Sequence, residues 1–294
     1  MTDALDNHAG SVSIGGQIVT NLRFADDIDL IAGTECELAD LVTRLDKAAA
    51  RYGMVISADK SKVMTNRKTP MTTRIMAADS QLETVEQFKY LGSILNNEGS
   101  KTGVLARAAQ TLAALAKLKP IWRDRAINLR SKLKLLRALV LSIFLYASET
   151  WTLTAELQRR IQALEMKCYR TILGITYRDR ITNDAIRRLI AAHVDNYEDL
   201  LSTVIKKKLK WYGHVTRGNG LSKVILQGTV NGKRRRGAQR KTWLDNIKEW
   251  TKCNFDTTQG IARDREQWRN PVHRSPSRCP CDPGGLWDRK VRAD

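Results

Sequence analysis

The chain has 294 residues, enough for one large domain or two ordinary ones, and its 42% hydrophobic and 28% charged content is typical of globular proteins. Its five cysteines are too few and too scattered for a disulfide framework, the N-terminus does not have the pattern of a signal peptide, and no apolar run is long enough to span a membrane. These features argue against disordered, disulfide-rich secreted and membrane-spanning proteins, and we expect a cytoplasmic or nuclear protein.

The 50 Lys and Arg and the 31 Asp and Glu give a net charge of +19 that is unevenly distributed. Residues 1–100 hold 10 basic and 14 acidic side chains, whereas residues 101–294 hold 40 and 17. A basic second part behind a slightly acidic first part favours binding to a long polyanion such as nucleic acid. A cationic surface that only keeps the protein soluble is the alternative.

The first predicted elements are short strands. Val12–Val19 has a Gly-Gly turn signal between apolar pieces, and Leu22–Ile31 predicts a tight β-hairpin with Asp26 and Asp27 at its tip. Adjacent carboxylates repel each other and must be solvated or neutralised by a cation, and their hard oxygen ligands suit Mg²⁺. The alternative is an ordinary turn, where Asp is common because its side chain bonds to its own backbone.

A helix is expected over Thr34–Tyr52, because Thr34 and Glu37 have the spacing of a capping box and an apolar face recurs at helical intervals. Gly53 follows the last turn, where a C-terminal cap belongs. Residues 54–95 predict short strands broken by turns.

From about residue 101 the apolar pattern changes to that of helices. One ends at Pro120, a second spans about 126–146 and carries several basic residues, and a third runs from Thr154 to Gly174. Cys168 falls on the apolar side of the third helix and is expected in the core.

Residues 180–252 are more basic still, and two clusters in them are candidate nucleic-acid-binding sites because cations attract phosphates. The first cluster is Lys206, Lys207, Lys208 and Lys210, and the second is Lys233, Arg234, Arg235 and Arg236. The second lies between glycines, which indicates an exposed loop, and a nuclear localisation signal is an alternative for it.

Trp243 and Trp250 follow at helical spacing. They stack on unpaired bases in one interpretation and pack in the core in the other. Residues 271–294 are rich in Pro, Ser and Arg without periodicity, and we expect a flexible tail. His273, Cys279 and Cys281 suggest zinc, but their spacing is not the usual one and a fourth ligand is not evident.

The ordered series of motifs resembles the reverse transcriptases of non-LTR retrotransposons, of the endonuclease-reverse transcriptase type, over about residues 12–270. Phe24-Ala25-Asp26-Asp27 resembles their metal-binding hairpin, and Phe88–Leu95 resembles their primer-grip hairpin. Other matching segments are Met54–Ser57, Lys60–Met64, Leu145–Trp151, Trp211–Val215 and Arg236–Trp243.

The resemblance implies an RNA-directed DNA polymerase that uses Mg²⁺ and a template-primer of RNA and DNA. It implies that Asp26 and Asp27 are catalytic metal ligands and that Lys60, with Lys62 as the alternative, is a cation facing the nucleotide. Tyr90, Leu91 and Gly92 are the implied primer contacts. The three helices beyond them resemble the thumb, which binds the duplex by its backbone.

Family polymerases use three carboxylates, and one comes from a strand well upstream of the Asp pair. Only 25 residues precede Asp26, and two adjacent acids do not hold two metal ions about 3.5–4 Å apart. We therefore expect this chain to be inactive alone and to need an N-terminal polymerase part in trans. A non-catalytic nucleic-acid-binding protein and a decayed element without a role are the alternatives.

The predicted fold class is α+β. An incomplete palm occupies residues 1–98, a helical thumb-like part 101–175, a basic helical region 176–270 and the tail 271–294. An exposed sheet edge beside the Asp hairpin is expected to make the first part less stable than the second.

Overall fold

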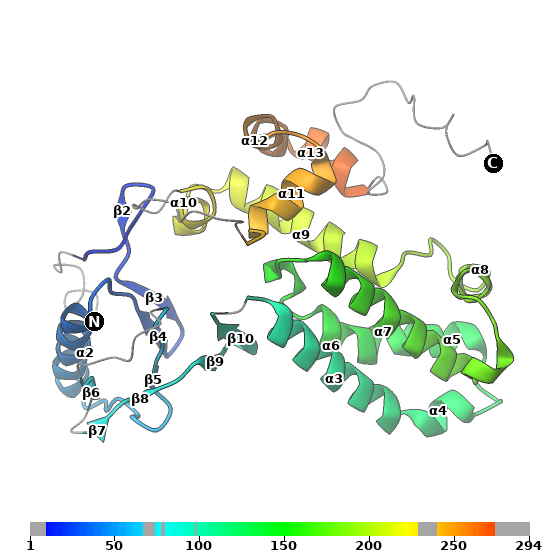
Figure 1. Ribbon diagram of the computed structural model, residues 1–294, viewed down its shortest axis with the longest axis horizontal. Helices are drawn as coiled ribbons and strands as arrows, with labels where there is room; N and C mark the ends of the chain where they lie inside the picture. Colours follow the sequence, from blue (N-terminus) through cyan, green and yellow to red (C-terminus); the bar gives the residue numbers. More distant parts are fainter. Residues whose placement is uncertain (1–9, 67–73, 78–79, 98, 229–239, 274–294) are drawn as a thin grey trace. The chain divides into compact units, whose positions relative to one another are not determined.

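The computed structural model describes residues 10–66, 74–77, 80–97, 99–228 and 240–273 (Figure 1). The chain forms a mixed α+β structure, as predicted. It divides into two compact units, Met1–Asn97 with Gly218–Ala238 and Glu98–Arg217 with Gln239–Asp294. No helix in the described ranges is both long enough and apolar enough to cross a membrane.

The strands of the first unit pair two by two. The antiparallel pairs are β1 (Ser13–Ile14) with β2 (Gln17–Ile18), β3 (Asn21–Phe24) with β4 (Asp27–Leu30), β6 (Met76–Ala77) with β7 (Ser80–Gln81), and β9 (Gln87–Tyr90) with β10 (Ser93–Asn96). Strands β5 (Lys62–Val63) and β8 (Glu83–Thr84) form a parallel pair. The hairpin predicted over Leu22–Ile31 is therefore confirmed, and so are the short strands within residues 54–95.

Helix α2 (Glu35–Ala50) supplies the core of the first unit, which also contains α10 (Leu221–Gln227). The buried side chains of Leu41 and Leu45 pack against Ile28 and Leu30 of β4. Because side chains alternate along a strand, this contact leaves the odd-numbered residues of β4 on the opposite face.

The predicted start of α2 is confirmed in part. The Thr34 hydroxyl accepts a hydrogen bond from the Glu37 N–H at 3.2 Å, as an N-cap does. The Glu37 carboxylate does not complete the capping box. It accepts from the backbone N–H groups of Ser11 at 2.8 Å and Gly33 at 3.0 Å, and so attaches the preceding segment to the helix.

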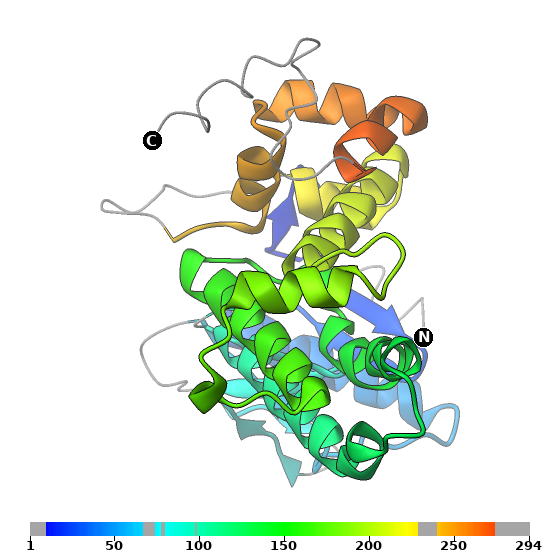
Figure 2. The same cartoon turned by 90° about the vertical axis from the view of Figure 1, so that its right-hand side faces the viewer.

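The second unit is helical (Figure 2). Its α-helices are α3 (Lys101–Lys117), α4 (Lys119–Arg123), α5 (Leu129–Leu135), α6 (Ser142–Leu145), α7 (Ala155–Leu173), α8 (Asn183–Ala191), α9 (Leu200–Arg217), α11 (Trp243–Thr251), α12 (Phe255–Arg263) and α13 (Arg265–His273). Helix α9 packs against α7, α12 and α13, and α3 packs against α6 and α7.

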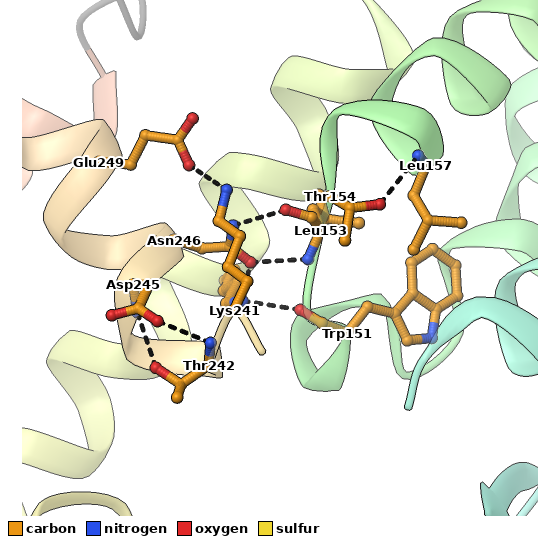
Figure 3. Close-up of polar contacts among 10 residues, drawn as sticks. Trp151, Leu153, Thr154, Leu157, Lys241, Thr242, Asp245, Asn246 and Glu249 are labelled. Carbon is orange, nitrogen blue, oxygen red and sulfur yellow. Dashed lines mark hydrogen bonds and ion pairs between the residues drawn. The ribbon is translucent and has the colours of Figure 1, made fainter. Parts of the chain in front are cut away.

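The predicted helix over 126–146 is interrupted. Between α5 and α6 lies a π-helical turn, Leu136–Leu141, whose wider winding is not visible in the apolar pattern. Helix α7 has the predicted ends, because the Thr154 hydroxyl accepts from the Leu157 N–H at 3.3 Å and Gly174 is left-handed at φ +68° (Figure 3). Cys168 is fully buried in this helix, as expected.

Candidate active-site hairpin and nucleic-acid interface

The Asp hairpin closes with a two-residue turn. Phe24 and Asp27 are the last paired residues, so Ala25 and Asp26 form the turn between β3 and β4. Ala25 has φ +54°, a left-handed conformation that L residues with a β-carbon seldom adopt. Asp26 and Asp27 are both exposed, which leaves their carboxylates open to solvent at the tip.

A third aspartate lies on the same strand. Asp29 is two residues beyond Asp27, so both side chains project from the face of β4 that is opposite the core. Partial burial raises the pKa of Asp29, a hydrogen bond from the Tyr90 side chain opposes this, and the charge of Asp27 adds to the rise. Sequence reasoning missed Asp29, although the period of two along the strand was a sufficient signal.

Tyr90 joins the β9–β10 hairpin to the Asp hairpin. Its hydroxyl forms a hydrogen bond with the carboxylate of Asp29, and burial together with this carboxylate raises the pKa of Tyr90 to about 12. The hydroxyl therefore stays protonated at neutral pH and acts as a donor. The structure thus brings the predicted primer-grip segment next to the Asp hairpin.

The other two predicted primer contacts, Leu91 and Gly92, form the turn between β9 and β10. Leu91 has φ +46° and Gly92 has φ +77°, and two positive φ values in a two-residue loop are typical of a type I′ turn. Gly92 suits this conformation, whereas Leu91 is strained in it. Leu91 is exposed, which places an apolar side chain at the tip.

The two candidate lysines differ in their surroundings. Lys62 pairs with Glu83 across β5 and β8 at 2.8 Å, whereas Lys60 is exposed in the turn before β5. Within the described ranges, no hydrogen bond or ion pair connects Lys60 to the Asp hairpin. Of the two lysines, Lys60 has the more exposed side chain and Lys62 is held in an ion pair.

The first unit fits a magnesium site only in part. Asp26 and Asp27 offer suitable oxygen ligands, but no group of three or more His, Cys, Asp or Glu side chains that could hold a metal ion occurs among the described residues. These residues do not make a complete two-metal centre by themselves.

The first predicted basic cluster is divided among different faces of α9. Lys206 pairs with Glu198 at 2.8 Å, and Lys207 donates to the Leu145 carbonyl at 2.8 Å. Lys210 is exposed. Lys208 is fully buried, so its assignment to a phosphate-binding surface is wrong. The physical reason is the helical period, which aligns Lys208 with the buried residues Val204 and Tyr212.

The buried amine of Lys208 is well partnered. Its Nζ donates to the Trp151 carbonyl at 2.7 Å and to the Asn246 Oδ1 at 2.8 Å, and it lies 4.4 Å from the ring centre of Trp243 and 5.4 Å from that of Trp250. Burial, followed by the nearby charge of Lys241, lowers the pKa of Lys208 to about 6. The group thus connects α9, α11 and the segment before α7.

Asn246 completes this junction (Figure 3). It accepts from the Leu153 N–H at 2.7 Å and donates to the Leu153 carbonyl at 2.8 Å. At the start of α11, Thr242 and Asp245 form a reciprocal capping box. The motif around Arg240–Trp243 therefore has a structural role in attaching α11.

The tryptophans near this junction are core residues. Trp250 and Trp268 are buried, which confirms core packing over base stacking for Trp250. Trp243 is half-buried, and its indole N–H donates to the Glu149 carbonyl at 2.8 Å. Gly213 of the Trp211–Val215 motif allows close packing, because a β-carbon there would lie 2.4 Å from the Trp268 ring.

The second basic cluster, Lys233, Arg234, Arg235 and Arg236, lies outside the described residues, as do Cys279 and Cys281.

Comparison with known proteins finds similarity to a transposon-derived protein. The chain is 28% identical over 274 residues to a protein of Caenorhabditis elegans whose name describes it as uncharacterized and transposon-derived. The match covers 89% of this chain and 98% of that protein. No family model and no solved structure matches the chain.

Proposed function

We propose that this chain derives from a non-LTR retrotransposon and forms the C-terminal part of its RNA-directed DNA polymerase. The observation that carries the proposal is the tight hairpin with Asp26 and Asp27 at its exposed tip, bonded through Asp29 to Tyr90 of the β9–β10 hairpin. The transposon-derived relative and the ordered motifs support it.

In this proposal the two units have separate roles. Asp26 and Asp27 contribute ligands for Mg²⁺, which in this family supplies charge stabilisation for phosphoryl transfer. Lys60 faces the nucleotide, and Leu91 and Gly92 face the primer, while the helical unit binds the RNA and DNA of the template-primer. Because the ligand set is incomplete, we infer that residues 1–294 need an N-terminal polymerase part, in the same polypeptide or in trans.

Primer extension tests the proposal. The chain alone, with a primed RNA template and Mg²⁺ or Mn²⁺, is expected to give no product. Addition of the N-terminal polymerase part of the same element is expected to give extension that Asp26→Ala abolishes. Asp40→Ala, which changes an exposed aspartate on α2, is the matched control and keeps the activity. Extension that survives Asp26→Ala would contradict the assignment.

A non-catalytic nucleic-acid-binding protein is the second candidate. It is favoured by the incomplete set of metal ligands among the described residues and by the excess of basic residues after residue 100. It predicts binding that weakens steeply with salt and does not change in Asp26→Ala. Failure of extension together with such binding would select it, and absence of both would favour a decayed element.

A further inference from the structure

The segment between α7 and α8 presents an exposed aromatic ring beside two exposed cations. Tyr177 is 83% exposed, which is unusual for so large a ring, and Arg178 and Arg180 beside it are also exposed. Neither the apolar pattern nor the basic clusters of the sequence predict a site in this segment, which joins the end of α7 to the start of α8 in Figure 1.

The backbone of this segment is held in place from both sides. Arg170 of α7 donates to the Ile181 carbonyl at 2.8 Å and to the Asn183 Oδ1 at 2.9 Å. The Asp179 carboxylate accepts from the Thr176 N–H at 2.6 Å and from its hydroxyl at 2.9 Å. The segment therefore loses little backbone entropy when a ligand binds to it.

The charges of the segment are left for a ligand. The bonds from the Thr176 backbone and side chain lower the pKa of Asp179 and keep its carboxylate occupied. The Arg178 guanidinium lies 5.9 Å from the Tyr177 ring centre, near the limit of a cation–π contact, and its Nε donates to the Tyr177 hydroxyl at 3.5 Å. With Tyr177 83% exposed, most of the ring stays open. No acidic side chain in the described ranges pairs with Arg178 or Arg180.

We propose that residues 175–181 are a stacking platform for an unpaired nucleotide of single-stranded nucleic acid. The base stacks on Tyr177, and Arg178 and Arg180 bind the flanking phosphates. A duplex does not fit this chemistry, because its bases are already stacked on each other. The proposal rests on nucleic-acid binding by the helical unit. It adds where on this unit the nucleic acid binds and that the bound strand is single, neither of which the proposed function specifies.

Binding of fluorescein-labelled 12-mers to the full-length chain tests the platform. One stacked base contributes about 1–3 kcal/mol, so Tyr177→Ala is expected to weaken binding of a single-stranded 12-mer by roughly 5- to 150-fold. Tyr177→Phe keeps the ring and should bind like the wild type. Tyr52→Ala removes another exposed tyrosine, 68% exposed and in the first unit, and should also bind like the wild type. Circular dichroism checks that each variant is folded.

Two further ligands separate stacking from phosphate attraction. An abasic 12-mer has phosphates but no bases, so Tyr177→Ala should leave its binding unchanged. The double variant Arg178→Gln/Arg180→Gln should lower the salt slope for a single strand by about 1.4, since each phosphate contact contributes about 0.7. RNA and DNA 12-mers tested side by side show which strand is preferred.

Several results would overturn the platform. Equal binding by Tyr177→Ala and the wild type would do so while leaving the proposed function intact. If Tyr177→Ala weakened binding of the abasic 12-mer as much as binding of the normal 12-mer, Tyr177 would have only a structural role. A wild-type chain that binds no 12-mer at low salt would overturn both the platform and nucleic-acid binding by the helical unit.

Discussion

Lys208 is an amine in an environment that normally excludes charge. Two hydrogen-bond acceptors and two aromatic rings surround it, and no carboxylate of the described residues bonds to it. These contacts compensate only part of the lost hydration, which is why its pKa falls to about 6. A lysine of this kind is a structural residue whose stability contribution depends on pH.

The sign of that dependence follows from proton binding. The pKa of Lys208 is about 6 in the folded chain and about 10.5 in the unfolded chain. Between these two pH values, the unfolded chain holds more protons at this amine than the folded chain does. The free energy of unfolding should therefore rise with pH across this interval. Urea unfolding at pH 7, 8 and 9 should show the rise in the wild type and a smaller one in Lys208→Met.

Lys210→Met is the control for this experiment. It changes an exposed lysine of the same helix and retains Lys208, so its stability should follow the wild-type pH dependence. Parallel pH curves for the wild type and Lys208→Met would show that the amine is charged in the folded chain across the range.

At the scale of elements, the turns and caps are where sequence reasoning succeeded. Apolar residues on either side of Asp26-Asp27 predict the strands of that hairpin, and Thr34, Thr154 and Gly174 mark helix ends through local hydrogen bonding. Such signals lie within a few residues of the feature they specify, so one sequence is enough to find them.

Features that depend on distant residues were harder to predict. The π-helical turn at Leu136–Leu141 leaves no mark in the apolar pattern. The bond between Asp29 and Tyr90 joins residues 61 positions apart in a chain of 294, and no local rule pairs them. Lys208 was misplaced because four lysines close together in the sequence suggest one surface, although the helix turns Lys208 into the core while Lys207 and Lys210 stay exposed.

The turn at Leu91-Gly92 gives a prediction at this scale. A left-handed conformation costs an L residue with a β-carbon about 1–2 kcal/mol, and Asn tolerates it better than Leu. Leu91→Asn should therefore stabilise the β9–β10 hairpin by about 1 kcal/mol, which slows amide hydrogen exchange in these strands roughly fivefold. Leu91→Ala has no side-chain amide to bond the local backbone in this conformation, as Asn does, and should gain less. Faster exchange in Leu91→Asn would mean that the leucine side chain contributes packing that outweighs the strain.

For the whole molecule, the two units differ in how they are built. The described strands of the first unit occur only in pairs, and two-stranded pairs are marginal unless they pack on something, here mainly α2. The second unit buries long helical faces around α7 and α9. Its buried residues follow one another along these helices, so it should open less often.

Limited proteolysis of the full-length chain checks this difference. Fragments from the second unit should persist after the first unit has been digested, and mass spectrometry of the early cuts should place most of them within residues 10–97. Cuts that accumulate first within α7 or α9 would contradict this order of stability.

The contacts of Asn246 hold together two stretches of the second unit that are far apart in the sequence. The second unit takes its residues from two separate stretches, Glu98–Arg217 and Gln239–Asp294, and the later stretch is attached through Asn246, Lys208 and Trp243. A single backbone break between residues 229 and 239 would divide the polypeptide while sparing these bonds. The two fragments should then copurify under native conditions and separate only in denaturant.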